Sequence, residues 1–181
     1  MSTMNEDITA VLFTEEQIRA RTQELGSRIS QEYEGKMPVL IGILKGGFMF
    51  MADLIRAIDI PLEVDFMAIS SYGSGVTSSG AVKIRKDIDV NIEGRHVIVV
   101  EDIIDSGLSI RYIRDYLMRH KPASVKVCAL LNKPEAHAKE LKIDYVGFNV
   151  GNEFVVGYGL DYDGLYRNLP YIGILKESIY T

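Results

Sequence analysis

The stretch RHVIVVEDIIDSGLS, residues 95–109, decides the fold of this chain. Its residues 97–100 are apolar and β-branched, as expected of a strand that is buried on both faces of a sheet. Two further runs, PVLIGIL (38–44) and SVKVCALL (124–131), have a similar apolar character. Because segments with helical spacing separate the three runs, the sequence predicts an α/β fold with a parallel central sheet.

Further elements are expected on both sides of these runs. The opening of the chain is expected to form one helix, which Thr14 and Gln17 cap and Gly35 ends. Other helices are expected at residues 48–58, 106–120 and 133–141. Strands are expected at residues 62–69, within 82–94, and at 144–148, 154–158 and 171–175. The Gly and Ser content of residues 71–82 is typical of a mobile loop.

Length and charge limit the classes of protein to which the chain can belong. Its 181 residues predict one domain, residues 1–181, with a small hood formed by the chain-terminal segments. A net charge of -5 argues against nucleic-acid binding through long-range attraction. No apolar run approaches the ~20 residues of a membrane span, and the N-terminus lacks a signal-peptide pattern. The single cysteine, Cys128, fits a reducing compartment, and we expect the cytoplasm.

The polar residues that follow the central apolar run are unusual. In an open α/β sheet, ligands bind beyond the carboxyl ends of the strands, and Glu101 and Asp102 stand at this position. Two adjacent carboxylates repel each other unless a divalent cation or sugar hydroxyls bind them. The plainer alternative is a solvent-exposed strand end.

The sequence DSGLS, residues 105–109, has the features of a phosphate cradle. A tight turn there would lead into the N-terminus of a helix, whose unpaired N–H groups face a bound anion. Gly107 would let the backbone approach the anion closely, and Ser106 and Ser109 would add hydroxyl donors. The alternative is that Asp105 or Ser106 only caps a helix. A phosphate cradle beside a diol-binding acidic pair favours a ribose phosphate as the ligand.

The segment VIVVEDIIDSGLS, residues 97–109, resembles the phosphoribosyl-pyrophosphate motif of the type I phosphoribosyltransferases. Its EDIID form is similar to that of the hypoxanthine-guanine branch, and the similarity extends from LKGG (44–47) to LDYDGLYRNLP (160–170). The resemblance implies a central, mainly parallel sheet flanked by helices, with a small hood. It also implies a Mg²⁺-dependent transfer of phosphoribose from 5-phosphoribosyl 1-pyrophosphate to hypoxanthine or guanine, which yields IMP or GMP.

The resemblance implies roles for residues on the donor side of the site. The phosphoribosyl group would be bound by Glu101, Asp102, Asp105, Ser106, Gly107, Leu108 and Ser109. The pyrophosphate would be bound by Lys45, Gly46, Gly47 and Arg167. A cis peptide bond is implied between Leu44 and Lys45. Ser71 and Tyr72 would begin a loop that closes over the site and excludes water.

It also implies roles on the purine side. Asp105 would be the general base that accepts the proton of purine N7. Lys133 would donate to the exocyclic O6, which favours a 6-oxopurine over adenine. Phe154 would stack on the base, and backbone groups of Val155 would read its Watson–Crick edge. Metal binding would fall to Glu101, Asp102 and Asp161, the last of which would also lie near the base.

Three alternatives remain open at this point. A transferase of the same fold could use xanthine, adenine or a pyrimidine. A regulator could bind phosphoribosyl pyrophosphate and control RNA or DNA, but the chain shows no clear basic run. A dinucleotide enzyme would need a G-x-G-x-x-G turn after its first strand, which LKGG does not supply. The preferred partners are the two small-molecule substrates, without nucleic acid or membrane, in a homodimer or homotetramer.

Overall fold

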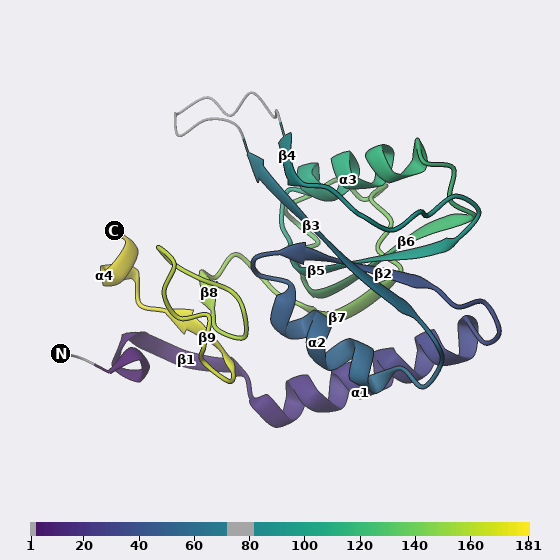
Figure 1. Cartoon of the computed structure of the whole chain (residues 1–181). Coiled ribbons are helices and arrows are strands. Elements are labelled where there is room, and N and C mark those ends of the chain that lie inside the picture. Colours follow the sequence, from purple (N-terminus) through teal and green to yellow (C-terminus); the bar gives the residue numbers. More distant parts are fainter. Residues whose placement is uncertain (1–2, 72–81) are drawn as a thin grey trace.

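A computed structural model of the chain describes residues 3–71 and 82–181. The described residues form a large core built on a six-stranded sheet and a smaller hood built on a three-stranded sheet (Figure 1). The N- and C-termini both lie in the hood, at the end of the molecule away from the core helices (Figure 1).

The core sheet is mainly parallel, as predicted. Its strands are β2 (Val39–Leu44), β3 (Glu63–Ser71), β4 (Val82–Lys86), β5 (His96–Ile104), β6 (Ser124–Asn132) and β7 (Tyr145–Asn149). Their order across the sheet is β4-β3-β2-β5-β6-β7. All neighbouring pairs are parallel except β3 and β4, which run antiparallel at one edge. The α/β fold class is therefore confirmed, with β5 in the interior of the sheet.

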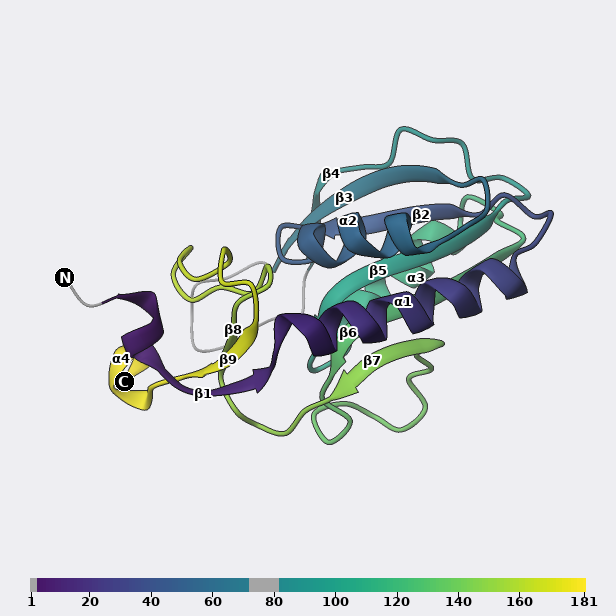
Figure 2. The same cartoon turned by 90° about the horizontal axis from the view of Figure 1, so that it is seen from below.

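Different helices cover the two faces of the core sheet (Figure 2). One face packs against α1 (Glu15–Glu32) and α2 (Phe48–Ala57), and the other against α3 (Leu108–Met118). The strand residues under α1 and α2 are Leu40, Ile98, Val100, Cys128 and Leu130. Those under α3 are Val39, Ile41, Val97, Val99 and Val127. Because successive strand residues point to opposite faces, continuous apolar runs give two apolar faces, as the sequence predicts.

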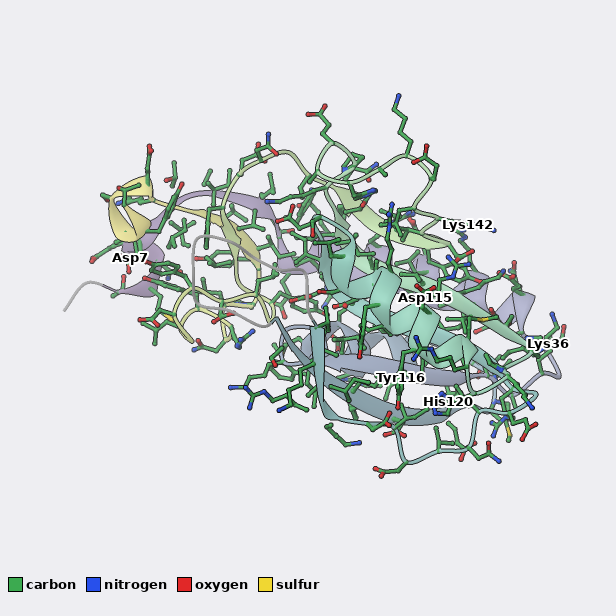
Figure 3. All side chains as sticks on the ribbon, turned by 90° about the horizontal axis from the view of Figure 1, so that it is seen from above. Asp7, Lys36, Asp115, Tyr116, His120 and Lys142 are labelled. Carbon is green, nitrogen blue, oxygen red and sulfur yellow. The ribbon has the colours of Figure 1, made fainter. Side chains whose placement is uncertain are left out.

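Two expectations for helices are wrong in detail. Residues 133–141 form separate turns and no helix: Pro134 has no N–H to donate, and the Lys133 N–H donates to Ile104 O at 2.9 Å, at the end of β5. The helix expected from residue 106 begins at Leu108, because Gly107 precedes it in the left-handed region at φ 76°. Both deviations lie at the carboxyl end of the core sheet. In Figure 3, Tyr116 near the C-terminal end of α3 and His120 in the turn after it lie far from Asp7 of the hood.

The hood is formed by segments from both ends of the chain. Its strands are β1 (Ile8–Phe13), β9 (Ile172–Leu175) and β8 (Val155–Val156), antiparallel in that order. A short 3-10 helix, η1 (Met4–Asp7), precedes β1, and α4 (Glu177–Tyr180) follows β9. The helix predicted after the Thr14 cap is confirmed as α1, and the Thr14 side chain accepts a hydrogen bond from the Gln17 N–H at 3.2 Å. The residues before Thr14 form η1 and β1. The hood has its own apolar cluster: Val156, Tyr166, Leu169 and Leu175.

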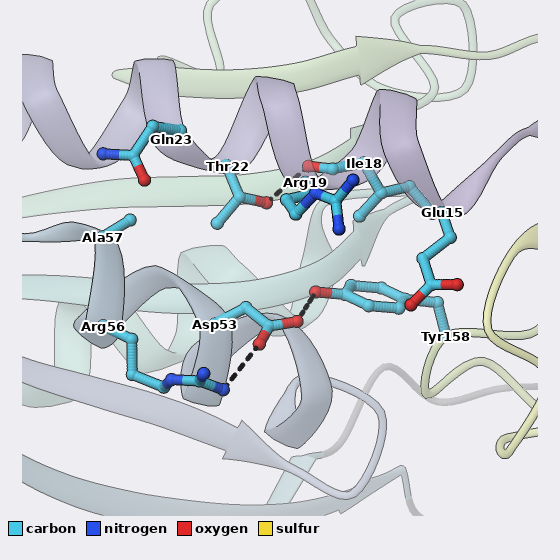
Figure 4. A pocket seen from close by; sticks show the side chains of 9 residues that line it. All are labelled: Glu15, Ile18, Arg19, Thr22, Gln23, Asp53, Arg56, Ala57 and Tyr158. Atoms are coloured by element: carbon cyan, nitrogen blue, oxygen red, sulfur yellow. Dashed lines mark hydrogen bonds and ion pairs between the residues drawn. The ribbon is translucent and has the colours of Figure 1, made fainter.

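Tyr158 joins the hood to the core. Its hydroxyl donates a hydrogen bond to the carboxylate of Asp53 on α2, and Asp53 also pairs with Arg56 at 3.5 Å (Figure 4). These residues line a cavity of about 310 Å³ between α1, α2 and the hood. The hydrogen bond therefore fixes the segment after β8 against the helix that follows β2.

Asp65 in β3 holds the antiparallel edge of the core sheet. The residue is 9% exposed, and its carboxylate accepts hydrogen bonds from the N–H groups of Phe66, Asp89 and Val90 at 2.7, 2.7 and 3.0 Å. Burial by itself would raise the pKa of Asp65, but the three backbone donors outweigh it and the pKa is lowered. The charged carboxylate therefore stabilises the turn after β4.

Replacing Asp65 with Asn should destabilise the fold by about 1–3 kcal/mol at neutral pH, because backbone donors lose a charged acceptor. Since the folded-state pKa is lowered, this contribution is present above the ordinary aspartate pKa and is lost as the pH falls through the lowered value. Urea unfolding at several pH values measures it. Asp65→Asn should show a flatter acid limb than the wild type. Identical acid limbs for Asp65→Asn and the wild type would contradict this role.

Candidate active site

The acidic pair, Glu101 and Asp102, lies within β5 near its carboxyl end, because the strand continues to Ile104. Glu101 is paired with Ala129 of β6 and is 8% exposed. Burial, with the neighbouring Asp102 carboxylate as a second cause, raises the pKa of Glu101 well above its ordinary value. Burial also raises the pKa of Asp102, although the Ile103 N–H donates to its carboxylate at 2.8 Å. A buried and a half-buried carboxylate side by side are costly, and a cation or hydroxyl donors would offset that cost.

The turn after β5 forms a small hollow at the N-terminus of α3. It encloses a cavity of about 110 Å³, lined by Glu101, Asp105, Ser106, Gly107 and Ser109 with three isoleucines. Gly107 has φ 76°, which favours glycine, and a Cβ there would lie 2.5 Å from Leu141 Cδ2, so the leucine side chain would have to move. Leu108 is 54% exposed and does not line the hollow, and its N–H donates to Ser106 Oγ at 3.4 Å. The hollow thus brings together five of the residues predicted to bind the phosphoribosyl group, whereas Asp102 and Leu108 do not line it.

The loop after β2 touches the acidic pair. The peptide bond between Leu44 and Lys45 is cis, as the resemblance implies. A Cβ on Gly46 would lie 1.7 Å from Asp102 Oδ2, so only glycine fits between this loop and the carboxylate. A Cβ on Gly47 would lie 2.7 Å from Ile43 O. The Lys45 side chain is exposed. The predicted pyrophosphate loop and the predicted ribose-binding pair therefore share one small region.

The hood completes this region through Gly159 and Arg167. A Cβ on Gly159 would lie 2.2 Å from Gly46 O, so the hood backbone comes directly against the loop after β2. Arg167 Nη1 donates to Gly159 O at 2.6 Å, and Arg167 Nη2 pairs with Asp161 Oδ1 at 2.8 Å. After burial, the charges of Arg167 and Asp161 also act on the pKa of Asp102, the first lowering it and the second raising it. Arg167 and Asp161 are thus placed beside the acidic pair, as the site prediction requires.

Lys133 and Asp105 lie together at the mouth of the hollow. Lys133 Nζ is 4.0 Å from Asp105 Oδ2, with the lysine side chain 15% exposed and the aspartate side chain 64% exposed. Lys133 begins the segment after β6, and its N–H donates to Ile104 O, directly before Asp105. A nearly buried cation and an exposed carboxylate therefore present a donor and an acceptor side by side.

Phe154 and Val155 lie at the open edge of the hood sheet. The Leu175 N–H donates to Phe154 O at 2.9 Å, and Val155 is the residue opposite Ile174. In an antiparallel ladder, residue pairs that exchange hydrogen bonds alternate with pairs that do not. The bond from Leu175 to Phe154 lies directly beside the pair Val155–Ile174, so Val155 and Ile174 exchange no hydrogen bonds with each other. The N–H and C=O of Val155 are therefore directed away from β9. Because β8 is an edge strand, these two backbone groups face outward, where a base could bind them.

Other predicted residues are only partly placed. Ser71 is the last residue of β3 and pairs with Val82 of β4, whereas Tyr72 lies outside the described residues. Within residues 3–71 and 82–181, no group of three or more His, Cys, Asp or Glu side chains is arranged to hold a metal by itself. In the same part of the chain, none of the helices has the length and apolar character to cross a membrane.

Sequence reasoning missed two contacts that shape the site, Gly159 against Gly46 and Tyr158 against Asp53. A signal for the first was present in the sequence, since Gly157, Gly159 and Gly164 crowd one short segment. In the structure all three have positive φ. Closely spaced glycines indicate a backbone that must turn sharply or approach another chain segment. The partner of each contact could not be read from the segment itself.

Known proteins with this arrangement can now be compared. Residues 12–163 match the phosphoribosyl transferase domain family. Two relatives called hypoxanthine-guanine phosphoribosyltransferase, from Streptococcus thermophilus and Streptococcus agalactiae, are each 52% identical over 178 residues, which is 98% of this chain and 99% of the relative. A crystal structure of a hypoxanthine phosphoribosyltransferase from Staphylococcus aureus matches with a TM-score of 0.95 and 46% identity, covering 99% of this chain and 98% of that one. The chain therefore belongs to the phosphoribosyltransferase family, in its hypoxanthine-guanine branch.

Proposed function

We propose that this chain transfers phosphoribose from 5-phosphoribosyl 1-pyrophosphate to hypoxanthine or guanine, with release of pyrophosphate. The observation that carries the proposal is the pairing of Lys133 Nζ with Asp105 Oδ2 at 4.0 Å beside the hollow at the start of α3. The names of the relatives from both streptococci support the same bases.

The chemistry of a 6-oxopurine explains why this pair supports the proposal. O6 and N7 lie on the same edge of such a purine. A protein that donates to O6 and accepts a proton from N7 therefore needs a donor and an acceptor next to each other. Lys133 has only donors to offer, and an ionised Asp105 has only acceptors. Adenine would present its 6-amino group to Lys133, so that two donors would face each other.

The donor would bind across β5 and the two loops beside it. Its 5-phosphate would lie on the backbone N–H groups and hydroxyls of residues 105–109, at the N-terminus of α3. Glu101 and Asp102 would accept hydrogen bonds from the ribose hydroxyls, which would offset the burial that raises the pKa of both. The pyrophosphate would lie on Lys45, Gly46 and Gly47, with Arg167 approaching from the hood.

Mg²⁺ fits this site as a metal that the protein and the donor bind together. Mg²⁺ usually binds through one or two carboxylates plus substrate phosphates and water, and needs no cage of protein ligands. Asp102, with Glu101 and Asp161 nearby, offers such carboxylates at the place where the pyrophosphate would lie. When bound, Mg²⁺ would neutralise charge on the leaving group.

The residues of this chain would then act in a defined order. The bond between ribose C1 and pyrophosphate breaks, the electron pair leaves with pyrophosphate, and the ribose gains oxocarbenium character. Purine N9 attacks C1, and the proton on N7 passes to the Asp105 carboxylate. Phe154 stacks on the base, and the backbone groups of Val155 that face away from β9 bind its Watson–Crick edge.

We also propose that the protein acts in the cytoplasm as a homodimer or homotetramer. Light scattering would test the oligomeric state.

A panel of bases tests the function directly. With donor and Mg²⁺ present, hypoxanthine and guanine should be converted to nucleotides, and adenine should be the poorest substrate because it lacks O6. Removing the metal with EDTA should abolish turnover, and added Mg²⁺ should restore it. Chromatography of the products measures every case, with xanthine as a fourth base. Adenine as the best substrate would refute the assignment of the base, and full activity in EDTA would refute the role of the metal.

The Asp105→Asn variant tests the proposed proton acceptor. Its kcat should fall by about 10²-fold or more, the usual scale for loss of a general base. The KM for the donor should change little, since the backbone N–H groups of the turn remain. Asp115→Asn, at an exposed position on α3, is the matched control and should keep wild-type kinetics. Unchanged kcat in Asp105→Asn would remove Asp105 from this role.

The Gly46→Ala variant tests the closeness of the pyrophosphate loop to the acidic pair. The new Cβ would lie 1.7 Å from Asp102 Oδ2, so the loop or the carboxylate must move. The KM for the donor should rise by more than about tenfold, which corresponds to ~1.4 kcal/mol. Gly151→Ala serves as control, because its Cβ would meet only the Glu153 carboxylate, an exposed group that can rotate away. Equal donor KM values in the two variants would show that the close approach does not matter.

A further inference from the structure

The aromatic ring of Tyr180, the last residue of α4, stacks on the ring of Phe154. The two ring centroids are 4.7 Å apart and the ring planes differ by 22°. Both side chains are 36% exposed. Phe154 is the residue proposed to stack on the purine, so the end of the chain contacts the base side of the site.

The hood holds Tyr180 in this position through several contacts. The Lys176 N–H, directly before α4, donates to Asp7 O at 2.9 Å. Ile179 packs against the hood cluster that contains Val156. The Leu175 N–H donates to Phe154 O, so the strand that leads into α4 also fixes the backbone of Phe154. The same small sheet therefore positions both rings.

The positions of three rings show which face of Phe154 remains for a base. Tyr162 meets Phe154 edge to face, with centroids 5.6 Å apart and an interplanar angle of 85°. The centroids of Tyr162 and Tyr180 are 6.4 Å apart. If Tyr162 and Tyr180 covered opposite faces of Phe154, the distance between their centroids would be close to the sum of their two distances from Phe154. The observed 6.4 Å is much shorter than that sum. Tyr162 thus lies toward the edge of Phe154, and neither tyrosine covers the face opposite Tyr180.

We propose that Tyr180 is a positioning residue for the purine: it covers one face of Phe154 and thereby orients the other face for stacking on the base. This inference rests on the proposed function. Tyr180 itself touches no substrate in this arrangement. A partly exposed phenylalanine ring can otherwise take several rotamers. Stacking by Tyr180 selects one of them before the base arrives.

The inference predicts weaker binding of the base and unchanged binding of the phosphoribosyl donor. An aromatic pair contributes enough that losing it should weaken base binding by about 2- to 12-fold. Tyr180→Ala should raise the KM for hypoxanthine by that factor and leave the KM for the donor unchanged. Tyr180→Phe keeps the ring and should match the wild type. Ser178→Ala, at an exposed position of the same helix, is the control for any general disturbance of α4.

A binding measurement separates this inference from the proposed function. Calorimetry should give a Kd for IMP that is about 2- to 12-fold higher in Tyr180→Ala, and a Kd for ribose 5-phosphate that is the same as in the wild type. Thermal unfolding of each variant shows whether the hood remains folded. A wild type without turnover would refute the proposed function, and the IMP measurement would still decide the role of Tyr180.

Three results would overturn the inference. Equal IMP affinity in the wild type and Tyr180→Ala would mean that the stack does not position Phe154. Tighter IMP binding in Tyr180→Ala would mean that Tyr180 competes with the purine for the same face. Loss of IMP affinity in Tyr180→Phe as large as in Tyr180→Ala would assign the effect to the hydroxyl and not to the ring.

Discussion

The close contact between Asp102 and Gly46 is the constraint on which the site depends. The interior strand β5 carries, near its carboxyl end, two carboxylates that burial makes difficult to ionise. The loop after β2 leaves no space for even one methyl group beside the Asp102 carboxylate. Strands β2 and β5 are neighbours in one parallel sheet, so the core itself enforces this approach. A ligand that contacts both segments must bring cations or hydroxyl donors, and a phosphorylated ribose with its metal brings both.

The hood adds the second half of the site by a similar close approach. Gly159 comes against Gly46 backbone to backbone, and Arg167 is fixed between Gly159 and Asp161. Tyr158 anchors this segment to α2 through Asp53. The phosphate side of the site is therefore built on rigid core strands, whereas the base side is built on a small sheet that joins the two ends of the chain. This division explains why the proposed base contacts, Phe154 and Val155, come from an edge strand.

Local patterns predicted the core well and the hood poorly. The apolar runs of β2, β5 and β6, the acidic pair and the turn at residues 105–109 carry strong signals within a few residues of sequence. By contrast, the pairing of β1 with β9 joins residues more than 150 positions apart, and the stack of Tyr180 on Phe154 depends on that pairing. Residues 133–141 have a helical composition, but the hydrogen bond from Lys133 to Ile104 and the contact of Leu141 with Gly107 hold them in turns. The sequence of one segment alone does not predict such long-range contacts.

The central claim is that the end of β5 and the turn after it bind a ribose phosphate whose base faces Lys133 and Asp105. A crystal structure of the protein with IMP tests it most directly. It should show the 5-phosphate on the backbone N–H groups of residues 106–109, the ribose hydroxyls on Glu101 and Asp102, and O6 and N7 of the base toward Lys133 and Asp105. A nucleotide bound elsewhere, or a purine whose O6 and N7 point away from that pair, would contradict the account.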